Sequence, residues 1–157
     1  MIQALVTDFA KVLLFPKDPT FQGRLNPLHK ELSQQPEYNP LDHFQINTEL
    51  LDFYASLKDR IRVYIFTSDV IQDAPEFQPF LQPVFEEIFS ASKLNTHKSH
   101  PEAYKMVAAQ LQLDPSVILY IDDNTEFVEA ATTAGMQAIH YQNNGELYTA
   151  VNHALTR

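Results

Sequence analysis

Polar residues of types that handle metal ions and phosphate stand at the ends of apolar runs in this sequence, or in the loops beside them. They are Asp8, the hydroxyl pair Thr67 and Ser68, Lys98, and the acidic pair Asp122 and Asp123. Carboxylates from two strands would form an oxygen-rich site of the kind that Mg²⁺ prefers, completed by waters and a phosphate group. A lysine and a hydroxyl would neutralise and hydrogen-bond the remaining phosphate oxygens. The residue types therefore suit phosphate chemistry if the fold brings them together.

The elements that must position these residues can be read from the apolar pattern. Short apolar runs predict buried strands over residues 2–7, 62–67, 87–91, 117–121 and 137–141. Helical spacing predicts helices over 47–60, 101–113, 124–134 and 145–155. This alternation is typical of a three-layer, Rossmann-like α/β fold with a parallel sheet of about five strands. Because ligands bind beyond the carboxyl ends of parallel strands, we expect the polar residues to converge at that edge.

A proline-rich segment over residues 15–45 interrupts this alternation. It holds half of the ten prolines: Pro16, Pro19, Pro27, Pro36 and Pro40. Proline costs a helix or a central strand a hydrogen bond, so the segment is predicted to be a loop with at most one or two short helices. The best helix candidate is 25–34. We interpret the segment as an insertion into a single domain of residues 1–157.

Composition limits the classes of partner. The chain carries 20 acidic and 11 basic residues, for a formal charge of −9, which argues against nucleic-acid and membrane-surface partners. No apolar run approaches the roughly 18 residues that span a bilayer. Cysteine is absent, which suits a reducing compartment, so we expect a cytoplasmic protein with small-molecule or protein partners.

Four short motifs, in order, resemble those of the haloacid dehalogenase-like (HAD) hydrolases. They are Val6-Thr7-Asp8-Phe9-Ala10-Lys11-Val12, Ile65-Phe66-Thr67-Ser68, Lys98 ahead of Pro101-Glu102-Ala103-Tyr104, and Ile121-Asp122-Asp123-Asn124. The resemblance is densest over residues 98–139 and covers nearly all of the chain except the proline-rich insertion. It implies an Mg²⁺-dependent hydrolase that acts on a small-molecule phosphate ester or a phosphorylated macromolecule.

The resemblance also implies a role for each site residue. Asp8 would attack phosphorus and form an aspartyl-phosphate, which divides one difficult step into two. Thr67 would hold the phosphate with the Ser68 backbone amide, and Lys98 would stabilise the nucleophile and the developing charge. The implied Mg²⁺ ligands are the Asp8 side chain, the Ala10 backbone carbonyl, Asp123, and Asp122 through a water molecule.

Two features depart from the resemblance. Phosphatases of the family usually carry an aspartate at the place of Ala10, where it protonates the leaving group and activates water, a contribution typically worth about 10²–10⁴-fold. Ala10 therefore predicts a slow phosphomonoesterase, a different reaction, or a weak or inactive relative that serves as a binding module. Only about 45 residues separate Leu14 from Arg60, so the cap domain of the family would be much reduced and the site open.

Two other interpretations of these residues are less consistent with the sequence. A phospho-accepting receiver domain also uses an aspartate, a threonine and a lysine on a parallel sheet, but it carries its acidic pair after the first strand. Here the pair Asp122 and Asp123 follows the fourth predicted strand, which argues against a receiver. His97 and His100 have the spacing of an H-x-x-H metal motif, but without further ligands nearby we interpret them as surface histidines.

Overall fold

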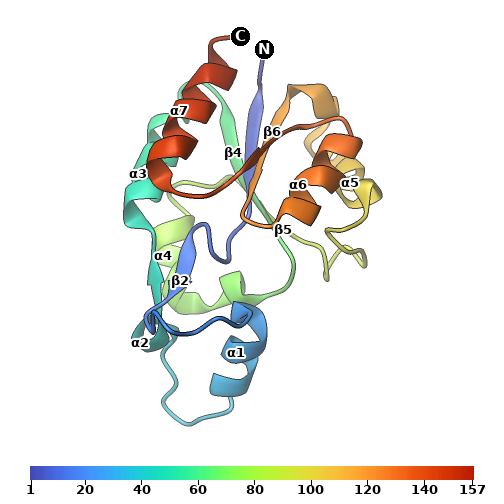
Figure 1. The fold of residues 1–157 in the computed structure, drawn as a ribbon. Coiled ribbons are helices and arrows are strands. Elements are labelled where there is room, and N and C mark those ends of the chain that lie inside the picture. Colours follow the sequence, from blue (N-terminus) through green and yellow to red (C-terminus); the bar gives the residue numbers. More distant parts are fainter.

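A five-stranded parallel sheet forms the centre of the protein in the computed structural model, which describes all of residues 1–157 (Figure 1). Its strands are β1 (Ala4–Thr7), β4 (Arg62–Thr67), β5 (Ile88–Ser90), β6 (Ile118–Asp122) and β7 (Gln137–His140). They lie in the order β5-β4-β1-β6-β7, and each neighbouring pair is parallel. The predicted α/β sheet of about five strands is confirmed.

Helices cover both faces of the sheet and complete the three layers. One face is covered by α3 (Thr48–Ser56) and α7 (Asn144–Leu155), the other by α5 (Pro101–Leu111) and α6 (Thr125–Thr133) (Figure 1). Because side chains alternate along a strand, Leu5 joins the core on the α3 and α7 side, whereas Val6 joins the core on the α5 and α6 side. Both faces of β1 are therefore buried.

The helix ends follow the local signals closely. The Asn124 side chain accepts a hydrogen bond from the backbone amide of Glu126 at the start of α6. Gly135 follows α6 with a φ of +100°, a left-handed conformation that glycine adopts readily and that closes the helix. α3 ends at Ser56, four residues before the predicted Arg60, because the chain continues there as a turn.

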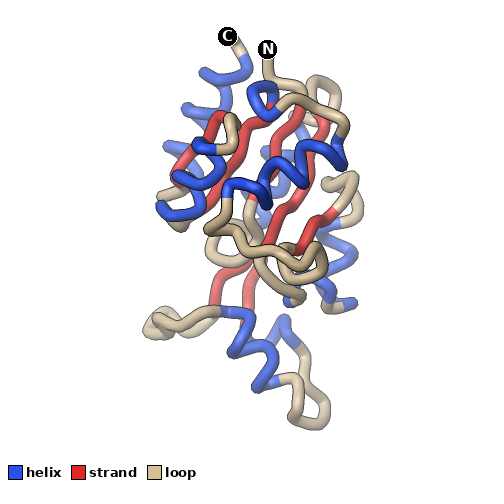
Figure 2. Tube along the Cα trace, turned by 90° about the vertical axis from the view of Figure 1, so that its right-hand side faces the viewer, coloured by secondary structure: helices blue, strands red, loops and turns tan.

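The insertion lies beyond the carboxyl ends of the strands (Figures 1 and 2). It contains two short helices, α1 (Leu25–Leu32) and α2 (Pro40–His43), which agrees with the prediction, although α1 ends two residues before the expected Gln34. β2 (Leu14–Pro16) and β3 (Phe44–Ile46) form an antiparallel pair at its base. The prediction of a loop from residue 15 to 45 was wrong here, because three-residue strands paired across the whole insertion leave no local pattern.

The remaining elements are short. They are the helix α4 (Gln78–Leu81) and the 3₁₀ turns η1 (Ile71–Asp73), η2 (Pro75–Phe77) and η3 (Pro115–Val117). None of the helices is both long enough and apolar enough to cross a membrane.

Candidate active site

β1 brings Asp8 to the carboxyl edge of the sheet and the chain then turns sharply. The Asp8 backbone amide donates to the Ile121 carbonyl at 2.8 Å, which ties Asp8 to the end of β6. The amides of Leu13 and Leu14 both donate to the Phe9 carbonyl, so the apolar run does not continue as one strand. None of the backbone bonds of this turn uses the Ala10 carbonyl, which leaves that oxygen available to a ligand.

Lys98 is buried between two carboxylates. Its Nζ lies 2.8 Å from Oδ1 of Asp8 and 2.6 Å from Oδ2 of Asp122, and its side chain is fully buried. The ammonium also lies 5.0 Å from the centroid of the Phe127 ring and 5.6 Å from that of Phe66, within cation–π range. The loop before α5 therefore places a fixed positive charge behind the Asp8 carboxylate.

Asp122 is held by hydrogen bonds to both of its carboxylate oxygens. Oδ2 accepts from Lys98 and from the Tyr120 hydroxyl, and Oδ1 accepts from the Asn124 backbone amide at 2.9 Å. The residue is completely buried. Asp122 therefore positions Lys98, which in turn contacts Asp8.

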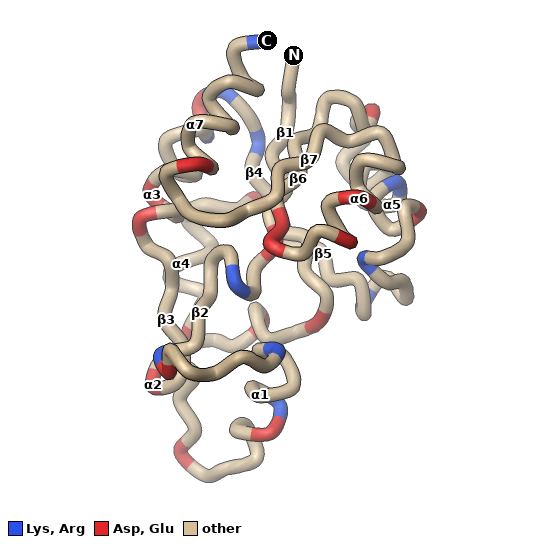
Figure 3. The backbone as a smooth tube through the Cα atoms, viewed as in Figure 1, with Lys and Arg blue, Asp and Glu red and all other residues tan.

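Asp123 completes a cluster of three acidic side chains. One carboxylate oxygen of each of Asp8, Asp122 and Asp123 lies within 4.8 Å of the others. Asp123 is half-buried, and its backbone carbonyl accepts a hydrogen bond from Nε2 of His140 at 2.9 Å. Figure 3 shows acidic residues gathered where β1 and β6 end. Three carboxylates at one edge of the sheet form a donor set that suits a hard divalent cation.

Asp8 and Asp123 hold their protons more tightly than isolated carboxyl groups do. Burial, followed by the charge of Asp122, raises the pKa of Asp8 to about 7 against the opposing effect of Lys98. Burial and Asp122 likewise raise the pKa of Asp123 to about 6. Burial opposes the charge of Lys98, but Asp8 and Asp122 outweigh it and raise the pKa of Lys98. A cation bound at this cluster would therefore displace protons near neutral pH.

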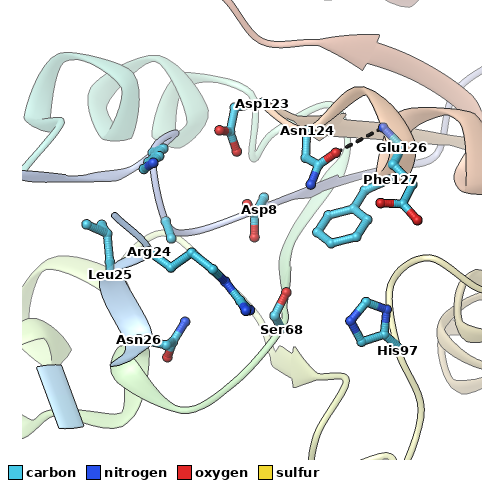
Figure 4. A pocket seen from close by; sticks show the side chains of 12 residues that line it. Asp8, Arg24, Leu25, Asn26, Ser68, His97, Asp123, Asn124, Glu126 and Phe127 are labelled. Atoms are coloured by element: carbon cyan, nitrogen blue, oxygen red, sulfur yellow. Dashed lines mark hydrogen bonds between the residues drawn. The ribbon is translucent and has the colours of Figure 1, made fainter. Parts of the chain in front are cut away.

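A pocket of about 320 Å³ opens directly above Asp8 (Figure 4). Its lining combines the strand ends Asp8, Ser68 and Asp123, the insertion residues Arg24, Leu25 and Asn26, and Ala10, Lys11, His97, Asn124, Glu126 and Phe127. Thr67 is 1 % exposed and is not among the residues that line the pocket. Lys98 and Asp122 do not line the pocket either, so Lys98 affects the pocket by its contact with the Asp8 carboxylate.

The sequence profile of the haloacid dehalogenase-like hydrolases matches residues 13–135. The chain belongs to this family. The matched range begins after Asp8 and includes the positions of Thr67, Lys98, Asp122 and Asp123. No curated protein matches the sequence.

Solved structures agree with the HAD-like fold. A HAD family enzyme from Bacteroides thetaiotaomicron, solved with magnesium and inorganic phosphate, aligns with a TM-score of 0.69 at 17% identity over 94% of this chain and 100% of its own. A HAD-like family hydrolase from Porphyromonas gingivalis gives a TM-score of 0.72 at 17% identity, covering 100% of this chain and 99% of its own. A 2-haloacid dehalogenase from Pseudomonas syringae gives 0.64 at 16% identity, over 90% and 86%. At these identities the likeness establishes the fold.

In this HAD-like chain, the structure adds residues that the sequence analysis missed. Tyr120 lies two positions before Asp122 on β6, and the period of two along a strand could have placed both on one face. Arg24 and Asn26 come from the insertion, where no local pattern points to a pocket. His97 and His100 are exposed, as predicted for surface histidines, but His97 also lines the pocket of this HAD-like site.

Proposed function

We propose that this HAD-like protein is an Mg²⁺-dependent hydrolase that cleaves phosphate esters through an aspartyl-phosphate on Asp8. One observation carries the proposal: the Asp8 carboxylate faces a pocket, is paired with the buried Lys98, and lies beside two further carboxylates. This arrangement offers a nucleophile, a fixed cation and a metal-binding donor set at a single point.

In the first step, an oxygen of Asp8 attacks phosphorus and the bond from phosphorus to the ester oxygen breaks. Water then hydrolyses the acyl phosphate, which releases phosphate and restores the carboxylate. The Lys98 ammonium, 2.8 Å from Asp8, keeps one carboxylate oxygen in place and offsets negative charge as it builds up. Ser68 lines the pocket and Thr67 directly precedes it, so the end of β4 would hold the phosphoryl oxygens.

The donor set fits Mg²⁺ as the cofactor. Asp8, Asp123 and the Ala10 carbonyl would hold the ion, with Asp122 acting through water because hydrogen bonds already occupy both of its oxygens. A bound Mg²⁺ relieves the repulsion between the anionic nucleophile and the anionic substrate. The magnesium and inorganic phosphate in the Bacteroides thetaiotaomicron structure support this assignment.

Replacing Asp8 with asparagine tests the nucleophile. We expect turnover of a phosphate-ester panel with Mg²⁺ to fall by at least about 10³-fold, because the amide cannot form the acyl phosphate. Trapping by beryllium fluoride should be lost as well. The control is Asp59→Asn, an exposed carboxylate outside the pocket. Turnover that survives Asp8→Asn would remove Asp8 from the role of nucleophile.

The raised pKa values of Asp8 and Asp123 predict a pH dependence. Without Mg²⁺, the folded protein holds the Asp8 proton up to about pH 7, whereas the unfolded chain releases it near 3.8, so this group stabilises the fold below pH 4 and its contribution is lost as pH rises toward 7. Mg²⁺ competes with the proton, so its affinity and its effect on the melting temperature should increase from pH 5.5 to pH 8. Calorimetric titrations at both pH values measure this, and equal affinities would contradict it.

Ala10 favours a second candidate function, a binding module that retains the phosphate site and turns over slowly or not at all. Ala10 lines the pocket without offering a proton donor. In that case, inorganic phosphate and Mg²⁺ would bind to the wild-type protein while no phosphate ester is hydrolysed. Binding and turnover measured on the same preparation distinguish the two functions.

A further inference from the structure

One wall of the pocket belongs to the insertion and carries a positive charge. Arg24, Leu25 and Asn26 line this wall, across from the start of α6. In Figure 4 the Arg24 side chain extends from the insertion toward Ser68. The guanidinium group therefore enters the pocket, where it can contact an anionic group of a bound ligand.

The position of Arg24 is set by the two residues that follow it. Leu25 is 1 % exposed and belongs to the main hydrophobic core. The Asn26 side chain accepts a hydrogen bond from the Ile71 amide at 2.9 Å, which ties the start of α1 to the segment after β4. Two independent contacts thus hold the backbone next to Arg24 against the body of the domain.

Arg24 has no acidic partner within the protein. The ion pairs of the structure join Lys93 to Asp73 and Lys98 to its two aspartates. Glu126 also lines the pocket, but in Figure 4 the Phe127 ring lies between its carboxylate and Arg24. In a chain with a net charge of −9, this is a positive charge left free to bind an anionic ligand.

We propose that Arg24 binds a second anionic group, carried by the leaving portion of the substrate. The inference rests on the proposed function, in which Lys98, Ser68 and the acidic cluster serve the phosphoryl group at the strand ends. Arg24 approaches from the opposite wall, and its guanidinium matches a carboxylate or a further phosphate through paired hydrogen bonds. The substrate is thus a phosphate ester with a second negative charge.

The test uses phosphonates, which bind without being cleaved. Calorimetry with Mg²⁺ gives dissociation constants for phosphonoacetate and 3-phosphonopropionate, and for the two carboxamides in which an uncharged amide replaces the carboxylate. Ethane-1,2-bisphosphonate is compared with the carboxamide of 3-phosphonopropionate. We expect the wild type to bind at least one ligand with a second charged group about 10-fold more tightly than the matching carboxamide. The ligand that binds more tightly than its carboxamide identifies the second anionic group as a carboxylate or a phosphate.

Variants of Arg24 assign the preference to this residue. In Arg24→Met, the ratio of the affinity for the ligand with a second charged group to that for its carboxamide should fall to about 1. Arg24→Lys should restore part of this preference. Arg60→Met, at an exposed arginine outside the pocket, should leave the ratio as in the wild type.

Three results would overturn the inference. The first is an equal affinity of the wild type for ligands with a second charged group and for their carboxamides. The second is a preference for the second charged group that persists in Arg24→Met. The third is an equal weakening of both kinds of ligand in Arg24→Met, which would place Arg24 on the phosphonate itself. Absence of binding by every phosphonate, together with no trapping by beryllium fluoride, would instead remove the proposed function and this inference with it.

Discussion

Replacement of Lys98 by methionine is expected to lower the free energy of unfolding by roughly 3–5 kcal/mol, the usual cost of removing one partner from a buried ion pair. Methionine fills a similar volume but leaves the carboxylates of Asp8 and Asp122 without their shared cation. Both carboxylates are almost inaccessible to water, so solvent cannot replace the lost interaction. Urea unfolding at pH 8 measures the change.

The loss from Lys98→Met should depend on pH. Without the lysine, the pKa of Asp8 in the folded state rises still further above its unfolded value, so the variant loses stability as pH rises and is closest to the wild type near pH 5. Adding Asp122→Asn removes one of the two stranded charges and should recover part of the stability.

The matched control for Lys98→Met is Lys93→Met. Lys93 pairs with Asp73 on the surface, where both side chains are about half exposed, and such a pair contributes about 0–1 kcal/mol. Equal losses from Lys93→Met and Lys98→Met would contradict the assigned role of Lys98 as the central charge of the site.

Ala10→Asp is expected to raise the turnover of alkyl phosphate esters by about 10²–10⁴-fold, the typical contribution of a positioned acid and base. Ala10 lines the pocket two residues after Asp8, so a carboxylic acid there would reach the leaving oxygen. The nearby carboxylates should raise the pKa of the new side chain and keep it protonated at neutral pH. Initial rates with Mg²⁺ at pH 7 measure the gain.

The leaving group provides an internal control for Ala10→Asp. An acyl phosphate releases a carboxylate that needs no proton, so its cleavage should gain far less than that of an alkyl ester. Ala10→Asn, which has nearly the same shape but cannot donate a carboxyl proton, should give no gain with either substrate. A silent wild type that gains nothing from Ala10→Asp would exclude the hydrolase and leave the binding module.

The five strands of the sheet were predictable because their signals are local. Arg62–Thr67 has the predicted limits, and the other four strands lie within two residues of theirs, since a short run of mainly apolar residues marks each of them in the sequence. Parallel strands place their carboxyl ends at one edge, so the sequence predicted that Asp8, Thr67, Ser68, Asp122 and Asp123 converge there. The family resemblance then supplied a chemical role for each of them.

By itself, then, the sequence determined the fold class and which polar residues lie at the edge of the sheet. Only the tertiary structure decided their pairing. Lys98 has the sequence context of a solvated loop lysine, yet it is buried against Asp122, 24 positions later, and Asp8, at the end of another strand. Arg24 reaches the pocket only because β2 pairs with β3 and α1 packs on the core. Contacts between distant segments leave no periodic trace, because periodicity records which face of an element is buried and not what lies against it.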